Sequence, residues 1–308
     1  MSNKTRTYLF VAVSTIFFAV ALYFSLNLLN AGKSYRSEME EYARVLTFEN
    51  RLLNIDEWAN PDASWPETRA RAEKQREEAV TARGQMNEAS FIFVLGSFLY
   101  LIASFFLFFK KADFYKYFTL SLIIVALLCL YVGIFCPMIE LSALKNDLKI
   151  PIEINVPLID YTIDMSKTFD GKMYFYYQNK SATDLISLLF RNNNFFVGFC
   201  ILLFSVVIPF FKMSVSIAVL FKPALLKKKF HYFVVHKIGK WSMADVFVAA
   251  SFLAYLSFNN MNTGIETQSV VLPGLYFFLA YCIISLVSSH LISVFQKQNM
   301  QVTTIENK

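Results

Sequence analysis

Apolar residues along the chain are gathered into long, nearly uncharged runs that are separated by polar segments. A membrane-spanning helix needs roughly 20 apolar residues, because the hydrocarbon core of a bilayer is about 30 Å thick. The runs that reach this length cover residues 8–29, 90–109, 117–138, 195–221, 241–258 and 272–294. The sequence therefore predicts an α-helical integral membrane protein with six transmembrane helices. No cleavage site follows the first run, so we expect it to remain as an anchor.

Basic residues predict how these helices are oriented. Lys110, Lys111 and Lys116 lie between the second and third runs, and residues 222–240 hold six lysines and no acid. Short basic loops usually stay in the cytoplasm. We therefore expect a multi-pass protein with both termini cytoplasmic, and with the two longer polar segments outside.

The first outside segment, about residues 32–88, has the pattern of two helices. An apolar stripe with heptad-like spacing follows its first half at Tyr35, Met39, Tyr42, Leu46 and Leu53. Ser64 and Glu67 then form a capping box that predicts the start of a second helix. A seam of small residues follows at Ala72, Ala79, Ala82, Met86 and Ala89. We expect a coiled helical hairpin. Its mixed charges are explained as a solvated face or, as the alternative, the hairpin docks a partner above the membrane.

The second outside segment, about residues 140–194, has the pattern of a small β-containing ectodomain. Apolar residues alternate with others from Ile150 to Leu158, with prolines on the alternate positions, which indicates an edge strand. Residues 172–178 predict another strand, which follows Asp170 and Gly171. Ser181 and Asp184 then have the spacing of a cap for a short helix over residues 182–190.

Composition supports the membrane class and narrows the kinds of chemistry. The 308 residues are 56% apolar and 17% charged, whereas soluble domains are about 45–50% apolar and about 25% charged. This excludes a soluble, disordered or nucleic-acid-binding protein, and the net charge of +6 is explained by the basic loops.

Sequence motifs of soluble enzymes are absent. The four cysteines lie in apolar runs without a CxxC pair, and the three histidines have no metal-ligand spacing. The chain also has no phosphate-binding glycine loop and no GxSxG motif. We therefore expect no enzyme activity, no metal, no cofactor and no nucleotide site.

Two charged residues lie inside the predicted spans, where a charge costs on the order of 2.5–3.5 kcal/mol. Counted at 1.5 Å per residue, Lys212 lies roughly 13 Å and Asp245 roughly 7 Å from the cytoplasmic boundary. Pro209 frees a backbone carbonyl near Lys212, and Ser205 and Ser285 offer hydroxyls on the fourth and sixth spans. These residues form either a structural ion pair that fixes helix packing or a proton relay in which Asp245 titrates.

Two segments near these charges resemble the signature of the paraquat-inducible protein A family. They are SVVIPFFK at residues 205–212 and GKWSMADVF at residues 239–247, which contains Trp241 and Ser242. Pro137 at the end of the third span, NKSATDLISLL at residues 179–189 and Leu-Pro-Gly at residues 272–274 agree with it. The resemblance covers about residues 115–295.

The resemblance implies a bacterial inner-membrane protein beside a periplasmic protein with a mammalian-cell-entry (MCE) domain. Such pairs are implicated in moving phospholipid between the two membranes. The family module implies four helices and a small periplasmic sheet, which we place at residues 113–308. Its polar positions fall on Ser205, Lys212, Asp245 and Ser285. Residues 1–112, the first two spans with the hairpin, resemble nothing in the family, and the zinc-binding CxxC pairs of many members are absent.

These implications define three expectations for function. The first is an inner-membrane subunit that loads or extracts lipid for a periplasmic MCE protein, with proton coupling through Lys212 and Asp245. The second is a non-transporting anchor or regulator of that partner. The third is a sensor whose hairpin at residues 32–88 detects a periplasmic signal, which the lack of a cytoplasmic output domain disfavours.

Overall fold

The computed structural model describes residues 3–306 except 60, 112, 152, 157–160, 165, 222–249, 252, 255–256 and 259–264. Among the described residues, five helices are long and apolar enough to cross a membrane. They are Lys4–Val45, Trp65–Phe108, Phe114–Phe135, Phe195–Phe221 and Pro273–Phe295. They correspond to five of the six predicted spans, although the helix predicted to end at residue 138 ends at Phe135. The remaining one, residues 241–258, lies mostly outside the described residues.

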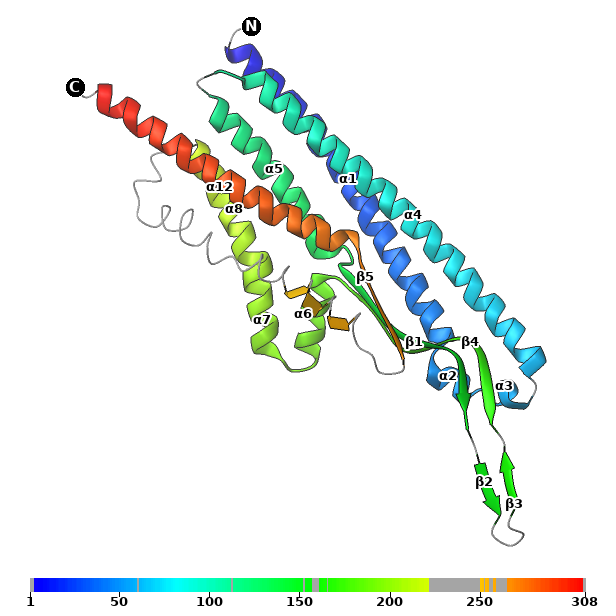
Figure 1. Ribbon diagram of the computed structural model, residues 1–308. Coiled ribbons are helices and arrows are strands. Elements are labelled where there is room, and N and C mark those ends of the chain that lie inside the picture. Colours follow the sequence, from blue (N-terminus) through cyan, green and yellow to red (C-terminus); the bar gives the residue numbers. More distant parts are fainter. Residues whose placement is uncertain are drawn as a thin grey trace.

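The two longest helices form an antiparallel hairpin, as the sequence predicts. They are α1 (Asn3–Val45) and α4 (Pro61–Phe108). At 1.5 Å per residue they measure roughly 65 and 72 Å, more than twice the thickness of a membrane core. Two short helices join them at the far end, α2 (Phe48–Leu52) and α3 (Ile55–Ala59). Figure 1 shows the pair side by side, with the two termini at the opposite end of the molecule.

Small residues on α4 let the two long helices approach closely. Ala79, Ala82 and Met86 are buried together with Leu28 and Tyr35 of α1. Because an alanine side chain is short, the larger side chains of the facing helix fill the space above it. The predicted seam of small residues on the second arm is thus confirmed.

Two details of the predicted hairpin are wrong. The first arm ends at Val45, so Leu53 leaves the stripe and is 76% exposed. The second arm begins at Pro61, three residues before the predicted cap at Ser64. Proline is favoured at the first position of a helix, because its fixed φ is already helical and no N–H partner is needed there.

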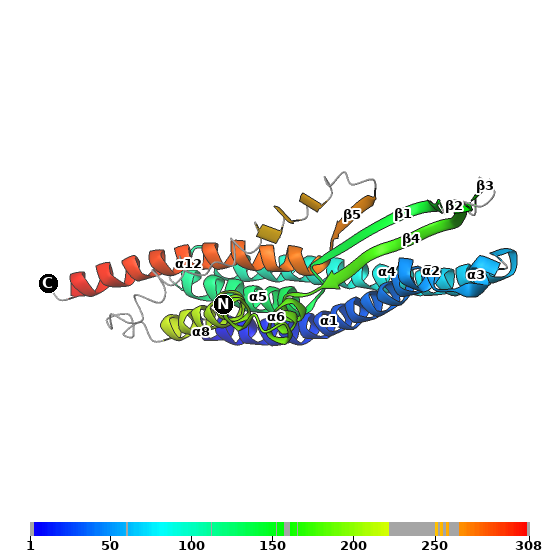
Figure 2. The same ribbon diagram turned by 90° about the horizontal axis from the view of Figure 1, so that it is seen from below.

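The remaining described helices pack around a central helix, α5 (Phe114–Phe135). The long helix α12 (Pro273–Glu306) lies along one side of it, and Figure 2 shows α1 on the other side. Gly133 permits the α5–α12 contact, since a Cβ there would lie 2.8 Å from the backbone nitrogen of Phe278. A third helical segment covers residues 195–221, and its second half packs against both α5 and α12.

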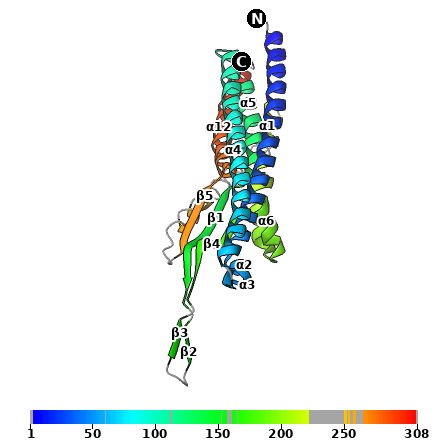
Figure 3. The same cartoon turned by 90° about the vertical axis from the view of Figure 1, so that its right-hand side faces the viewer.

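An antiparallel sheet lies beyond one end of these helices in the order β4-β1-β5. Its strands are β1 (Ile139–Ile150), β4 (Lys167–Lys180) and β5 (Glu266–Val271). A second ribbon extends from it and is formed by β2 (Glu153–Val156) and β3 (Tyr161–Asp164). Figure 3 shows this ribbon reaching farther out than α2 and α3. The predicted strands at residues 150–158 and 172–178 are therefore confirmed in part by β2 and in full by β4.

The sheet also corrects the sequence analysis at two places. Gly171 lies within β4 rather than before it, at a register shift where its φ is +75°. A left-handed φ of this kind favours glycine. The loop expected before the last span contains β5, which pairs with β1 from Ile139↔Val271 to Leu144↔Glu266.

A buried arginine fixes the far end of the hairpin to the sheet. Arg51 of α2 is 1% exposed and pairs with Glu57 of α3, its Nε lying 3.1 Å from Oε1. Its Nη1 donates to the backbone carbonyl of Lys172 in β4 at 3.2 Å, and the guanidinium lies 4.0 Å from the ring centroid of Trp65. One side chain thus connects α2, α3, α4 and β4.

Replacing Arg51 is expected to destabilise the protein strongly. Arg51→Ala leaves Glu57 buried without its partner, a loss that costs about 3–5 kcal/mol. The measurement is the free energy of unfolding of detergent-solubilised protein. Arg71→Ala is the matched control, because Arg71 and Glu67 form an exposed pair that contributes at most about 1 kcal/mol. Equal losses for the two variants would contradict the structural role of Arg51.

Candidate functional site

Lys212 lies at a buried contact between two of the apolar helices. It belongs to α8 (Ile208–Phe221), is 2% exposed, and donates from Nζ to Oγ of Ser285 in α12 at 2.8 Å. No carboxylate within the described residues forms an ion pair with it. Asp245, its predicted partner, and Trp241 and Ser242 lie outside the described residues.

A change of helix type places Lys212 in this position. The helix α7 (Phe195–Leu202) continues into a π-helical turn, η1 (Leu203–Val207), which ends immediately before α8. Pro209 has no N–H for the Ser205 carbonyl four residues earlier, and its ring would crowd that carbonyl in a regular α-helix. The wider π turn relieves this crowding, and π turns often occur at functional sites. Ser205 itself is buried within the turn.

Further hydroxyl groups flank the Lys212–Ser285 contact. Ser216 is buried one turn after Lys212 on α8, and Ser288 is buried one turn after Ser285 on α12. Ser288 and Ser289 both donate to the backbone carbonyl of Ser285, at 3.0 and 2.8 Å. The sequence analysis missed Ser216 and Ser288, although their i+4 and i+3 spacing places them on the faces that carry Lys212 and Ser285. The result is a polar layer of an ammonium group and hydroxyls between α8 and α12.

Pro137 lies where α5 meets the sheet. It follows the extended residue Cys136 that ends α5, and its carbonyl accepts a hydrogen bond from Gly274 N at 3.0 Å. A Cβ at Gly274 would lie 2.4 Å from the Cys136 carbonyl oxygen. The start of α12 is therefore held tightly against the end of α5.

A second polar cluster lies where the hairpin touches the sheet. The Tyr35 hydroxyl donates to Oε2 of Glu140 in β1 at 2.5 Å. Burial raises the pKa of Glu140, and the Tyr35 hydrogen bond and the Arg83 charge oppose that rise. The guanidinium of Arg83 lies 5.9 Å from the centroid of the Tyr35 ring. No sequence motif marks this cluster, because its members come from α1, α4 and β1.

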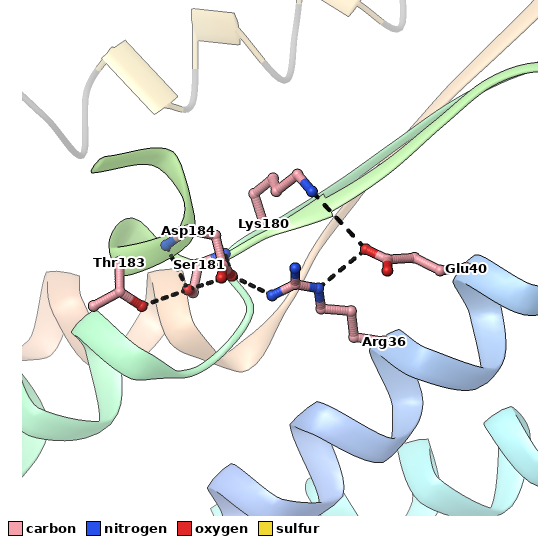
Figure 4. Close-up of polar contacts among 6 residues, drawn as sticks. All are labelled: Arg36, Glu40, Lys180, Ser181, Thr183 and Asp184. Atoms are coloured by element: carbon pink, nitrogen blue, oxygen red, sulfur yellow. Dashed lines mark hydrogen bonds and ion pairs between the residues drawn. The ribbon is translucent and has the colours of Figure 1, made fainter. Parts of the chain in front are cut away.

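An ion pair joins α1 to the helix that follows β4 in the chain, α6 (Ala182–Arg191). Figure 4 shows Arg36 between Glu40, whose Oε1 lies 3.0 Å from Nε, and Asp184. Asp184 also accepts from the Ser181 backbone N–H at 3.0 Å, while Ser181 Oγ accepts from Asp184 N at 3.2 Å. The predicted capping box is thus confirmed, and the same carboxylate caps α6 and holds α1.

A groove of about 540 Å³ lies between α4 and the beginning of α12. Its lining is mainly apolar, and two buried residues of α5, Val125 and Cys129, form part of it. Phe93 of α4 and Phe277 of α12 contribute rings that contact each other edge to face, with 5.2 Å between their centroids. This volume is within the range of small-molecule sites, about 300–1,000 Å³.

The groove has a polar end, and the rest of its lining is apolar except for Ser90 and Ser97. Arg83 and Asn87 line it near β5 and the start of α12, and Phe98 and Leu101 line it farther along α4. From Arg83 to Leu101 the helix rises roughly 27 Å. Arg83 is the one charged residue among the described residues that line the groove. It forms no ion pair within the described part of the chain.

The long apolar helices and the small sheet at their end define a multi-pass membrane protein. Within it, residues 171–296 match the model of the family described as Paraquat-inducible protein A. This confirms the family resemblance for that part of the chain, which contains Lys212 and Ser285 and begins later than the expected residue 115. Comparisons with curated proteins and with solved structures give no match.

The Arg36–Asp184 pair predicts a pH-dependent stability. Burial alone would raise the pKa of Asp184, but the hydrogen bonds from Arg36 and Ser181 outweigh it and lower the pKa. The ionised carboxylate therefore stabilises the folded state above the unfolded pKa of about 3.9, and this contribution is lost as the pH falls below that value. Asp184→Asn should lower the melting temperature at pH 7 and have a smaller effect at pH 3.

Glu41→Gln is the control for this measurement, because Glu41 pairs with Arg44 on the exposed face of α1. It should change the melting temperature little at either pH. An effect of Asp184→Asn that is as large at pH 3 as at pH 7 would contradict the stabilising role of the ionised carboxylate.

Proposed function

We propose that this protein is the inner-membrane subunit of an MCE-type intermembrane lipid transport system. In this proposal it loads or extracts phospholipid for a periplasmic MCE-domain protein. The observation that carries the proposal is the apolar groove between α4 and α12, whose lining includes the exposed apolar residues Phe91, Val94 and Tyr276, in a chain whose residues 171–296 match the family. A lipid in the surrounding bilayer could enter such a groove without crossing a polar surface.

The position of the sheet supports the same proposal. The groove's polar end lies at Val271 and Leu272, where β5 passes into α12. The sheet and the hairpin tip lie on that side of the membrane-spanning helices (Figure 1). If this side faces the periplasm, as the basic loops predict, the headgroup end of the groove opens toward the MCE partner.

The Lys212 layer is proposed to couple transport to a proton movement. A lysine at membrane depth is costly and usually faces a partner or an aqueous path. Its ammonium group bonds Ser285 across the α8–α12 contact, so a change in this bond alters how the two helices pack. Asp245 is proposed as the group that takes up and releases the proton.

A non-transporting anchor of the MCE partner is the second candidate function. The contacts of Arg51 favour this anchor function. They fix the hairpin to the sheet, and a fixed hairpin gives the MCE partner a rigid surface to bind. Affinity purification separates the two functions. A transport subunit retains phospholipid and the MCE partner, whereas an anchor retains the partner without lipid in the groove. Purification without any MCE protein would contradict both.

Removing the Lys212 ammonium group is expected to abolish most of the activity. Lys212→Ala should reduce lipid delivery on the order of tenfold or more, the change that about 1.4 kcal/mol in a barrier produces. Ser285→Ala should reduce it less, because the lysine keeps its charge. The measurement is complementation of a deletion strain, with protein levels checked by immunoblotting.

Ser214→Ala is the control, since Ser214 is exposed on the same helix and bonds only locally to the Phe210 carbonyl. This variant should complement fully. Full activity of both Lys212→Ala and Asp245→Asn would disprove the proposed relay.

A further inference from the structure

We propose that the groove between α4 and α12 binds one phospholipid molecule, with its phosphate at Arg83 and its acyl chains toward Leu101. The inference rests on the proposed function for its biological purpose, but the binding is argued from the groove alone. Three properties carry it: the depth of the groove relative to the bilayer, the single cation at its end, and its concave apolar lining.

The depth of the groove corresponds to one leaflet. The predicted span on α4 begins at residue 90, so Arg83 lies roughly 10 Å outside the hydrocarbon boundary, in the headgroup layer. Leu101 lies roughly 17 Å inside that boundary. Half of the hydrocarbon core is about 15 Å, so the groove covers one leaflet from headgroup to midplane. A lipid of that leaflet can therefore enter it without changing its orientation.

The charge at the polar end is complementary to a phosphate. Arg83 is exposed, and its guanidinium presents donors suited to two phosphate oxygens. Asn87 is exposed one helical turn deeper and adds an amide at the level expected for the lipid's ester groups. Within the described residues the groove lining contains no acid that would repel a phosphate.

The remainder of the lining suits acyl chains. Phe91, Val94 and Phe98 of α4 are exposed large apolar residues on one side, and Tyr276 of α12 is exposed on the other. The groove is concave because α5 forms its floor between α4 and α12, where the buried residue Val125 lines it. A lipid here contacts three helices, whereas a lipid on the outer face of a single helix contacts only that helix. The site is thus distinct from ordinary bilayer contact.

Photo-crosslinking in proteoliposomes tests the site. The probe is a phosphatidylglycerol with a diazirine group on one acyl chain, and the crosslinked positions are mapped by peptide mass spectrometry. Crosslinks are expected to concentrate at Phe91, Val94 and Phe98, compared with Val20 and Tyr23, which are exposed on α1. A diacylglycerol with the same diazirine chain but no phosphate should label the groove residues about five- to tenfold less.

Two variants separate the roles of the charge and of the cavity. Arg83→Gln should reduce groove labelling by phosphatidylglycerol to the diacylglycerol level, whereas Arg71→Gln, outside the groove on the same helix, should leave it unchanged. Val94→Trp should reduce labelling by both probes, because it fills the cavity. Circular dichroism and melting temperature confirm that each variant is folded.

The results distinguish failure of the phospholipid site from failure of the proposed function. Equal labelling of groove and α1 positions, or labelling that Arg83→Gln leaves unchanged, would overturn the phospholipid site. A protein crosslinked in the groove in place of lipid would overturn it as well. Labelling that depends on Arg83, in a protein that purifies with no MCE partner, would uphold the site and contradict only the proposed function.

Discussion

Polar contacts hold the outer half of the α1–α4 hairpin against the sheet and α6, and they join segments that lie far apart in the chain. The two long helices are longer than a membrane core is thick: along the apolar part they pack against α5, and beyond it they are held by polar contacts with β1, β4 and α6. Three contacts do this. On α1, Tyr35 bonds Glu140 of β1 and Arg36 pairs with Asp184 of α6, and on α2 Arg51 donates to the Lys172 carbonyl of β4. Each one joins a residue of the first 60 to a residue after position 138. Together these contacts join the N-terminal hairpin to the later part of the chain, although the two are far apart in the sequence.

The groove lies where the hairpin meets α5 and α12. Helix α4 packs against α1 and α5, and its Phe93 ring contacts Phe277 near the beginning of α12. One wall of the groove therefore belongs to the part of the chain that matches the family, and the other walls lie before residue 171. The N-terminal helices thus complete a surface that the matched residues do not form by themselves. The Lys212–Ser285 layer lies between α8 and α12, so α12 is the element common to both features.

Parts of this arrangement could be predicted from the sequence and parts could not. Apolar runs predicted the spanning helices, because membrane depth alone demands their length, and the local Ser181–Asp184 spacing predicted a cap. The β1 and β5 strands were missed because their pairing joins residues more than 100 positions apart and Lys145, Asn146 and Asp147 interrupt the apolar alternation. Leu53 was misplaced because a heptad pattern continues in a sequence even where the helix has ended. The groove depends on the spacing of α4, α5 and α12, which no local sequence pattern predicts.

We infer that α4, α5 and α12 together form a phospholipid-binding groove. An electron cryo-microscopy map of the protein in lipid nanodiscs tests it most directly. The map is expected to show elongated density in front of Val125 that runs along α4 and ends in a compact feature beside Arg83. A groove without such density, or density there that continues into a protein helix, would contradict it.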